Sequence, residues 1–190
     1  MLRVDDTGVV WTNWAATASG RPAEIAHPSS TAQAAVLVAA ARDRGLHVKA
    51  VGSGNSFTPL GVTDGVLVDL DRLTGVVAAD VPSGLVRVKG GTRLRDLNRA
   101  LAALGLALLN LGDIDKQSIT GALATGTHGT GARFAGLASV VSAAQVVLAD
   151  GSVVDVDADR DPQLFEAARI SLGALGIVTE LTLQCVPAFL

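Results

Sequence analysis

The sequence has little of what marks a secreted, membrane-spanning or nucleic-acid-binding protein. Cys185 is the single cysteine in 190 residues, so an intramolecular disulfide is excluded. The net charge is −3, and no Lys/Arg cluster stands out that would neutralise nucleic-acid phosphates. No apolar run approaches the roughly 18 residues that span a bilayer, and acidic residues stand where a secretory signal would be apolar. We therefore expect a soluble, cytoplasmic protein without a nucleic-acid partner, with peripheral membrane attachment left open.

Aromatic residues are also scarce, at 3%, although 49% of the residues are hydrophobic. The core must therefore be built mainly from Ala, Val and Leu. Glycine is plentiful, with 21 residues and no collagen-like period, which indicates many tight turns. The length suffices for one domain or for two closely packed lobes.

The first third of the chain reads as a strand–helix–strand unit. Residues 23–28 form a short strand ended by proline, and 46–51 alternate apolar and polar residues as a half-buried strand does. Between them, residues 29–45 predict a helix with a capping box at Ser30 and Gln33 and a C-terminal stop at Gly45. The loop that follows leaves the carboxyl end of the second strand, where ligands gather in open α/β sheets.

The rest of the chain alternates strands with two helices. Further strands are expected at 65–70, 84–90 and 176–187, with a two-residue hairpin around Asp150-Gly151 inside 143–158. Helices are expected at 92–105, with Thr92 as N-cap, and at 161–170, with Asp161 as N-cap and Pro162 in the first turn. The pattern predicts an α+β fold with two lobes: a small βαβ lobe over about 1–75, and a larger, mainly antiparallel sheet with helices over about 76–190.

The loop Gly52-Ser53-Gly54 raises the question of a nucleotide site. A Rossmann turn needs a third glycine where Phe57 stands and a helix that opens at once, and a Walker loop needs Gly-Lys-Ser/Thr, which is absent. The remaining possibility is an anion-binding nest of backbone N–H groups with the Ser53 and Ser56 hydroxyls as further donors. An ordinary Gly-Ser turn is the alternative.

A second loop, "NLGDIDKQSITGALATGTHGTG" (110–131), carries small and polar residues almost throughout. Glycines let its backbone amides approach a flat or charged ligand closely. His128 is either a structural residue or one that faces a ligand, and its bare surroundings favour the second reading. The three histidines are scattered without a carboxylate or cysteine at ligand spacing, so no metal site is expected. No nucleophile elbow occurs either.

Together these segments resemble the FAD-binding (PCMH-type) domain of vanillyl-alcohol-oxidase-type flavoenzymes. The nearest branch is the oxidases and dehydrogenases of L-gulono-1,4-lactone, D-arabinono-1,4-lactone and alditols. The matching segments are "WTNWA" (11–15), "VGSGNSFTPLGVTDGVLVDLDRL" (51–73), "GTRLRDLNRALAALGLALLNLGDIDKQSITGALATGTHGTG" (91–131) and "LGALGIVTELTLQCVP" (172–187). The resemblance implies two α+β lobes with FAD extended between them.

The resemblance also implies which residues contact FAD. Backbone amides of the first loop would hold the pyrophosphate: Ala50, Val51, Gly52, Ser53, Gly54, Asn55 and Ser56. The second loop would line the flavin and its phosphates with Asp113, Ser118, Gly121, Thr125, Gly126, Thr127 and His128. Ile177 would contact the adenine end, and His128 would sit near the flavin and tune its electron affinity.

Two departures from the family pattern modify this expectation. Asn55 stands where the family usually has the histidine that is bonded covalently to the flavin, and a carboxamide nitrogen is a poor nucleophile. FAD is therefore expected to be non-covalent. The chain also ends at Leu190, where family members continue into a substrate-binding cap, so the catalytic residues stay unassigned.

Three functional hypotheses follow. The first is the FAD-binding domain of an oxidoreductase that oxidises a CH–OH group of a sugar lactone or polyol by hydride transfer to flavin, with the electron acceptor left open. The second is a non-catalytic FAD-binding module or subunit, whose cap comes from another chain or which self-associates over the missing-cap surface. The third is a folded remnant that binds cofactor weakly.

Overall fold

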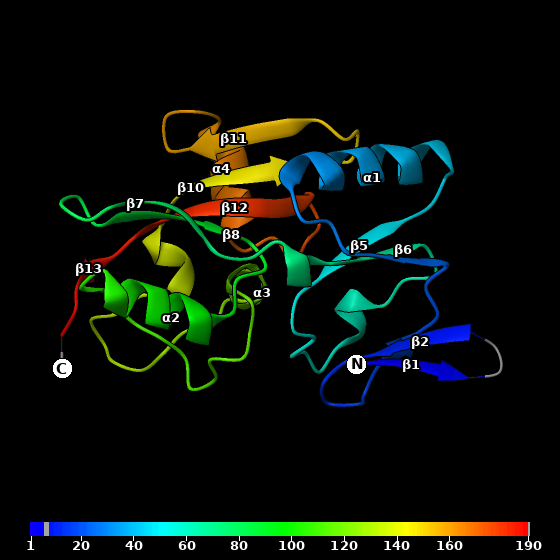
Figure 1. Ribbon diagram of the computed structural model, residues 1–190, viewed down its shortest axis with the longest axis horizontal. Helices are drawn as coiled ribbons and strands as arrows, with labels where there is room; N and C mark the ends of the chain where they lie inside the picture. The colour runs from blue at the N-terminus through cyan, green and yellow to red at the C-terminus, as the bar shows by residue number, and fades with distance from the viewer. Residues whose placement is uncertain (6–7, 190) are drawn as a thin grey trace.

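A computed structural model describes residues 1–5 and 8–189, so Asp6, Thr7 and Leu190, the last residue of the printed sequence, lie outside the described residues. The fold is α+β, as expected, and Figure 1 shows two sheets side by side with helices against them. None of the helices in the described part is long and apolar enough to cross a membrane.

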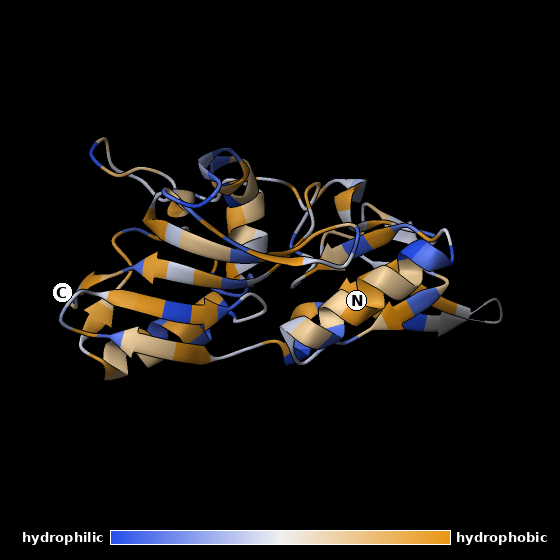
Figure 2. Ribbon diagram, turned by 90° about the horizontal axis from the view of Figure 1, so that it is seen from above, coloured by the Kyte–Doolittle hydropathy of each residue, from blue (hydrophilic) through white to orange (hydrophobic). Residues whose placement is uncertain are grey.

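The smaller sheet is parallel and contains the expected strand–helix–strand unit. Its strands lie in the order β4 (Glu24–Ala26), β6 (Val66–Asp69), β5 (Val48–Val51). The crossover helix α1 (Thr31–Asp43) begins at Ser30, whose hydroxyl accepts a hydrogen bond from Gln33 N (3.2 Å). Gly45, just past the helix end, has a φ of 66°. The ribbon of α1 is hydrophobic along its middle and hydrophilic at its ends (Figure 2).

An antiparallel ribbon of three strands lies beside the parallel sheet. Its members are β1 (Leu2–Asp5), β2 (Gly8–Thr12) and β3 (Ser19–Gly20). Trp11 on β2 is buried and packs with Val51 and Leu67 of the parallel sheet. Two short 3-10 turns, η1 (Pro59–Gly61) and η2 (Leu70–Arg72), flank β6.

The larger sheet is antiparallel, with five strands in the order β11-β10-β12-β8-β7. Their bounds are β11 Val153–Asp157, β10 Val141–Val147, β12 Ile177–Gln184, β8 Leu85–Lys89 and β7 Val76–Asp80. Apolar residues of its strands form one core with three helices, α2 (Leu94–Ala103), α3 (Ile119–Ala124) and α4 (Pro162–Arg169), and with the turn η3 (Leu137–Val140). A small sheet of β9 (Leu106–Ala107) and β13 (Val186–Pro187) completes the described elements.

A second core joins the two sheets. Val38 of α1 and Val66 of β6 pack in one cluster with Val147 of β10 and Ile177 of β12. Because this cluster draws on both parts of the chain, the lobes are packed closely. The proposed division near residue 75 stays a prediction.

Three local expectations need correction. The N-cap of α2 is Arg93 and not Thr92, because the Thr92 hydroxyl is engaged elsewhere: it donates to Lys89 O (2.6 Å) and accepts from Gly75 N (3.0 Å). The β10–β11 connection has one more residue than expected, since Leu148 N bonds Ser152 O and Gly151, at φ 85°, follows the turn. The final strand stops at Gln184, and the next residues pair with β9.

Candidate functional site

The two glycine-rich segments, far apart in the sequence, meet at one point in the fold. Gly52 follows β5 directly, and a Cβ placed on it would overlap Ser118 Oγ and come within 2.9 Å of Ser118 Cβ. The next residue, Ser53, donates its hydroxyl to Lys116 O at 2.6 Å. The approach is so close that only a glycine fits at position 52. The two loops therefore lie against each other, and their role as a single cofactor site stays a prediction.

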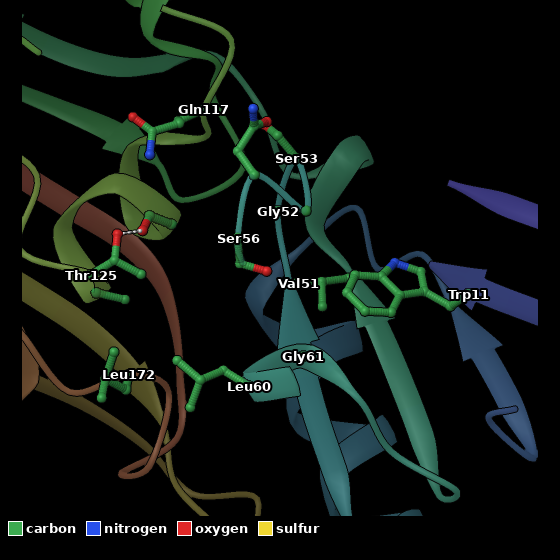
Figure 3. A pocket seen from close by; sticks show the side chains of 14 residues that line it. Trp11, Val51, Gly52, Ser53, Ser56, Leu60, Gly61, Gln117, Thr125 and Leu172 are labelled. Carbon is green, nitrogen blue, oxygen red and sulfur yellow. Dashed lines mark hydrogen bonds between the residues drawn. The ribbon is translucent and has the colours of Figure 1, made fainter. Parts of the chain in front are cut away.

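A cavity of about 110 Å³ opens between these loops. Figure 3 shows Ser53 and Ser56 on one side, with Gln117 and Thr125 on the other. The Thr125 hydroxyl donates to Gly121 O (3.1 Å). The lining residues are Trp11, Val51, Gly52, Ser53, Gly54, Asn55, Ser56, Leu60, Gly61, Gln117, Gly121, Ala124, Thr125 and Leu172.

Two further cavities continue the first along the junction of the sheets. One, of about 70 Å³, shares Val51, Gly52 and Gly121 with the first cavity. It also shares lining residues with a third cavity of about 430 Å³, which reaches Ile177 at the start of β12. We call the three cavities together the inter-sheet groove. It is elongated and mostly lined by small and apolar residues, as a site for an extended cofactor with a flat ring would be.

The groove also offers unpaired backbone donors. Among the described residues, none accepts a hydrogen bond from the backbone N–H of Ser53, Gly54 or Asn55, and all three residues line the groove. Gly54 has a φ of 65°, in the left-handed region. Successive N–H groups in such a turn form a concavity that binds anions. The loop is thus suited to a phosphate or pyrophosphate.

Most of the predicted contact residues line the inter-sheet groove. They are Ala50, Val51, Gly52, Ser53, Gly54, Asn55, Ser56, Gly121, Thr125 and Ile177. Ser118 is buried behind the groove, where its hydroxyl caps α3 by accepting from Gly121 N (3.2 Å).

The other predicted residues lie outside the groove lining: Asp113, Gly126, Thr127 and His128. His128 is exposed, and its Nδ1 lies 2.9 Å from Gly129 O. Asp113 is exposed as well. Their roles toward a cofactor stay predictions from the resemblance.

Several lining residues were not predicted from the sequence. Gln117 and Ala124 belong to the second loop, whose composition could have indicated them. Trp11, Leu60 and Leu172 come from separate segments, and only the fold brings these ordinary apolar residues to one cavity. Figure 3 shows Leu60 and Leu172 facing each other across the cavity.

Charged residues gather beside the first loop. Asp69 lies opposite Val51 in the β5–β6 pairing. Burial and the neighbouring Asp71 carboxylate raise the pKa of Asp69. The hydrogen bond from Asp71 N and the charges of His27 and Arg93 lower it, but by less. His27 Nδ1 lies 2.8 Å from Asp71 Oδ1. The potential ligand atoms of His27, Asp69 and Asp71 lie within 4.8 Å of one another, a grouping that spacing along the chain does not reveal. His27 and Asp69 each contact Asp71 by a hydrogen bond or ion pair. The expectation that the protein holds no metal stays a prediction.

Several known proteins are similar to this chain in sequence and fold. The FAD binding domain family matches residues 22–157. An L-gulono-1,4-lactone dehydrogenase from Mycobacterium tuberculosis is 47% identical over 180 residues, which cover 95% of this chain and 41% of that protein. An L-gulonolactone oxidase from Mus musculus is 36% identical over 182 residues, covering 96% and 41%. The structure of a chitooligosaccharide oxidase aligns with a TM-score of 0.83 at 27% identity, over 93% of this chain and 38% of that chain. This chain spans about two fifths of the length of the curated relatives it matches.

Proposed function

Because this chain belongs to the FAD binding domain family and is similar to sugar-lactone oxidoreductases, we propose that its inter-sheet groove is the FAD site. The observation that carries the proposal is the turn at Ser53, Gly54 and Asn55, which has unpaired backbone N–H groups and lines the groove. A pyrophosphate is an anion, and its oxygens can accept hydrogen bonds from these N–H groups.

The residues present fit such a cofactor. Gly52 and Gly121 let the two loops pack closely, because a Cβ at either position would come within 2.8 Å of Ser118 Oγ. The donors that the first loop offers are its backbone N–H groups, since the Ser53 hydroxyl, expected as a further donor, already donates to Lys116 O. The third cavity, which contains Ile177, is the largest of the three at about 430 Å³ and is suited to the adenine end. When bound, FAD supplies a hydride acceptor for a C–H bond whose carbon carries a hydroxyl.

We also propose that FAD is held without a covalent bond. Asn55 lines the first cavity, at the position where the resemblance places a linking histidine. The lone pair of its carboxamide nitrogen is delocalised into the carbonyl, so the side chain is a poor nucleophile. Neutral imidazole has an available lone pair and would react more readily.

An absorbance spectrum before and after acid precipitation tests cofactor and attachment together. The protein, purified or incubated with FAD, is expected to show flavin absorbance, and acid should release that colour into the supernatant. Asn55→Ala is the matched control and should release FAD in the same way. Colour that stays with the precipitated wild-type protein would refute the non-covalent proposal. A protein that takes up no FAD would refute the site and favour the remnant hypothesis.

The activity that we propose for the whole protein is oxidation of a CH–OH group in a sugar lactone or polyol. The names of the relatives, which act on gulonolactone, support this class of substrate. Loss of flavin absorbance on anaerobic addition of L-gulono-1,4-lactone to the FAD-loaded chain would show that residues 1–190 suffice for oxidation of this substrate by the flavin. Retained absorbance would favour the binding-module alternative.

One uncovered surface beside the site gives a test of that alternative. Trp14 and Phe57 are 57% and 71% exposed, and their rings meet edge to face with centroids 6.2 Å apart. Asn55 and Ser56, which precede Phe57 directly, line the first cavity. An uncovered aromatic surface beside a site favours association with another chain or a second copy. Sedimentation at several concentrations would detect that association, and Trp14→Ser should weaken it.

A further inference from the structure

Arg93 holds together the two segments that form the groove, although it is not among the residues that line it. Its side chain instead lines a separate cavity of about 470 Å³, together with Asp71, Thr74 and Thr92. Sequence patterns gave no reason to single it out, because it reads as an ordinary charged residue at the start of a helix.

The guanidinium of Arg93 closes a triangle of hydrogen bonds between the loops. Its Nη1 donates to Lys116 O (2.9 Å) and also to Ser53 Oγ, which in turn donates to Lys116 O (2.6 Å). Ser53 belongs to the loop after β5 in the parallel sheet, whereas Lys116 belongs to the segment that leads into α3. The triangle therefore connects the two walls of the groove.

The backbone around Arg93 is hydrogen-bonded to residues 117–119, which lie on the same wall of the groove as Lys116. Leu94 N donates to Gln117 O (2.9 Å), and Ile119 N donates to Thr92 O (2.8 Å). An antiparallel bridge pairs Arg93 with Ser118. Arg93 cannot shift relative to residues 117–119 without breaking these bonds. Its side chain therefore extends from a fixed backbone position to Ser53, in the loop after β5 on the opposite wall.

We propose that Arg93 is a positioning residue that sets the separation of the two walls and pre-organises the Ser53–Asn55 amides for the cofactor. The inference rests on the proposed FAD site. Arg93 acts through Ser53 and Lys116 and does not itself contact the cofactor. A planar guanidinium presents several donors in a fixed geometry, and it can serve two acceptors at once. A loop that is ordered before FAD binds loses less conformational entropy on binding, so the affinity for FAD is higher.

The test compares Arg93→Met with Arg95→Met, two positions further along the chain. The wild-type Arg95 side chain is exposed, and its Nε lies 3.8 Å from Asp96 Oδ1. Arg93→Met is expected to weaken FAD binding roughly tenfold, on the order of one charge-assisted hydrogen bond. It should also speed hydrogen exchange at the Ser56 amide of the FAD-free protein, whose N–H donates to Gly54 O (2.8 Å). Arg95→Met should change neither quantity. Arg93→Lys, which keeps the charge and one donor group, should restore part of both.

A double-mutant cycle separates positioning from direct contact. If Arg93 acts through Ser53, Arg93→Met should weaken FAD binding much less in the Ser53→Ala protein than in the wild type. Equal, additive effects would overturn the proposal, as would unchanged exchange at the Ser56 amide. Failure of the wild-type protein to bind FAD would instead refute the proposed function, while the exchange measurement would still test the triangle. If Arg93→Met does not fold, Arg93→Lys and the Ser53→Ala exchange profile carry the test.

Discussion

At the scale of single residues, Gly52 is the position of the site that has the least room for a side chain. A Cβ there would overlap Ser118 Oγ, and Ser118 is 1% exposed with its hydroxyl already capping α3. The neighbour therefore has no room to move aside. Gly52→Ala is expected to lower the free energy of unfolding by about 1–3 kcal/mol, the usual range for overpacking, and to weaken FAD binding.

Urea denaturation and an FAD titration would measure both effects. Gly136→Ala is the matched control, because a Cβ at Gly136 would meet its nearest neighbour, Thr127 O, at an ordinary 3.7 Å. Equal stability of the two variants would contradict the close approach of the loops.

The residue scale also shows which parts of the site could be predicted from the sequence. The composition of the loop that contains Gly52 and Gly54 left two alternatives open, an anion-binding nest and an ordinary Gly-Ser turn. The FAD contacts assigned to this loop, Asn55 included, were predicted from the family resemblance. The Arg93–Ser53 contact could not be predicted, since it joins residues 40 positions apart through side chains of common types. The roles of such residues depend on which segments the fold places together.

At the scale of elements, α4 depends on an unusual cap. Asp161 has a φ of 51°, in the left-handed region, and its carboxylate accepts a hydrogen bond from Leu164 N (3.1 Å). Asp161→Ala removes the acceptor and places an alanine in a strained conformation, so we expect a loss of about 1–3 kcal/mol in the free energy of unfolding.

The conservative variant isolates the cause. Asparagine tolerates the left-handed region and caps helices well, so Asp161→Asn should cost less than about 0.5 kcal/mol. Thermal unfolding of both variants checks the prediction. A loss as large in Asp161→Asn as in Asp161→Ala would show that neither the cap nor the backbone conformation is responsible.

Elements with local signals were predictable, and those held by distant partners were not. The ends of α1 and α4 are marked by capping residues within a few positions, so both helices were predicted almost to the residue. The edge strand β7 is exposed at all five positions and shows no alternation, and α3 has six residues with a glycine inside. Their stability comes from pairing with β8 and from packing in the large core, which a local pattern does not encode.

At the scale of the whole molecule, the groove exists because two differently built sheets share a core. Val38 and Val66 on one side pack with Val147 and Ile177 on the other. Ile177 also lines the third cavity, so the residues that join the sheets and those that line the site overlap. Loss of this packing would open the groove, and cofactor binding and folding should therefore be linked.

The shared core predicts that both sheets unfold together. The chain's two tryptophans, Trp11 and Trp14, lie near the N-terminus, so intrinsic fluorescence reports on the smaller sheet. Leu97 on α2 is fully buried in the core of the larger sheet. Leu97→Ala is expected to cost about 2–5 kcal/mol and to lower the urea midpoint seen by tryptophan fluorescence as much as the midpoint seen by far-UV circular dichroism.

The exposed Val36→Ala on α1 is the control and should shift both midpoints by little, less than about 0.5 kcal/mol in stability. A fluorescence midpoint that stays in place while the circular dichroism midpoint falls would mean that the sheets unfold separately. The groove would then lie between independent units, and its width would no longer follow from packing. Coincident shifts in Leu97→Ala are expected because Val147 and Ile177 belong to strands that also carry the larger core, so damage to that core reaches the junction directly.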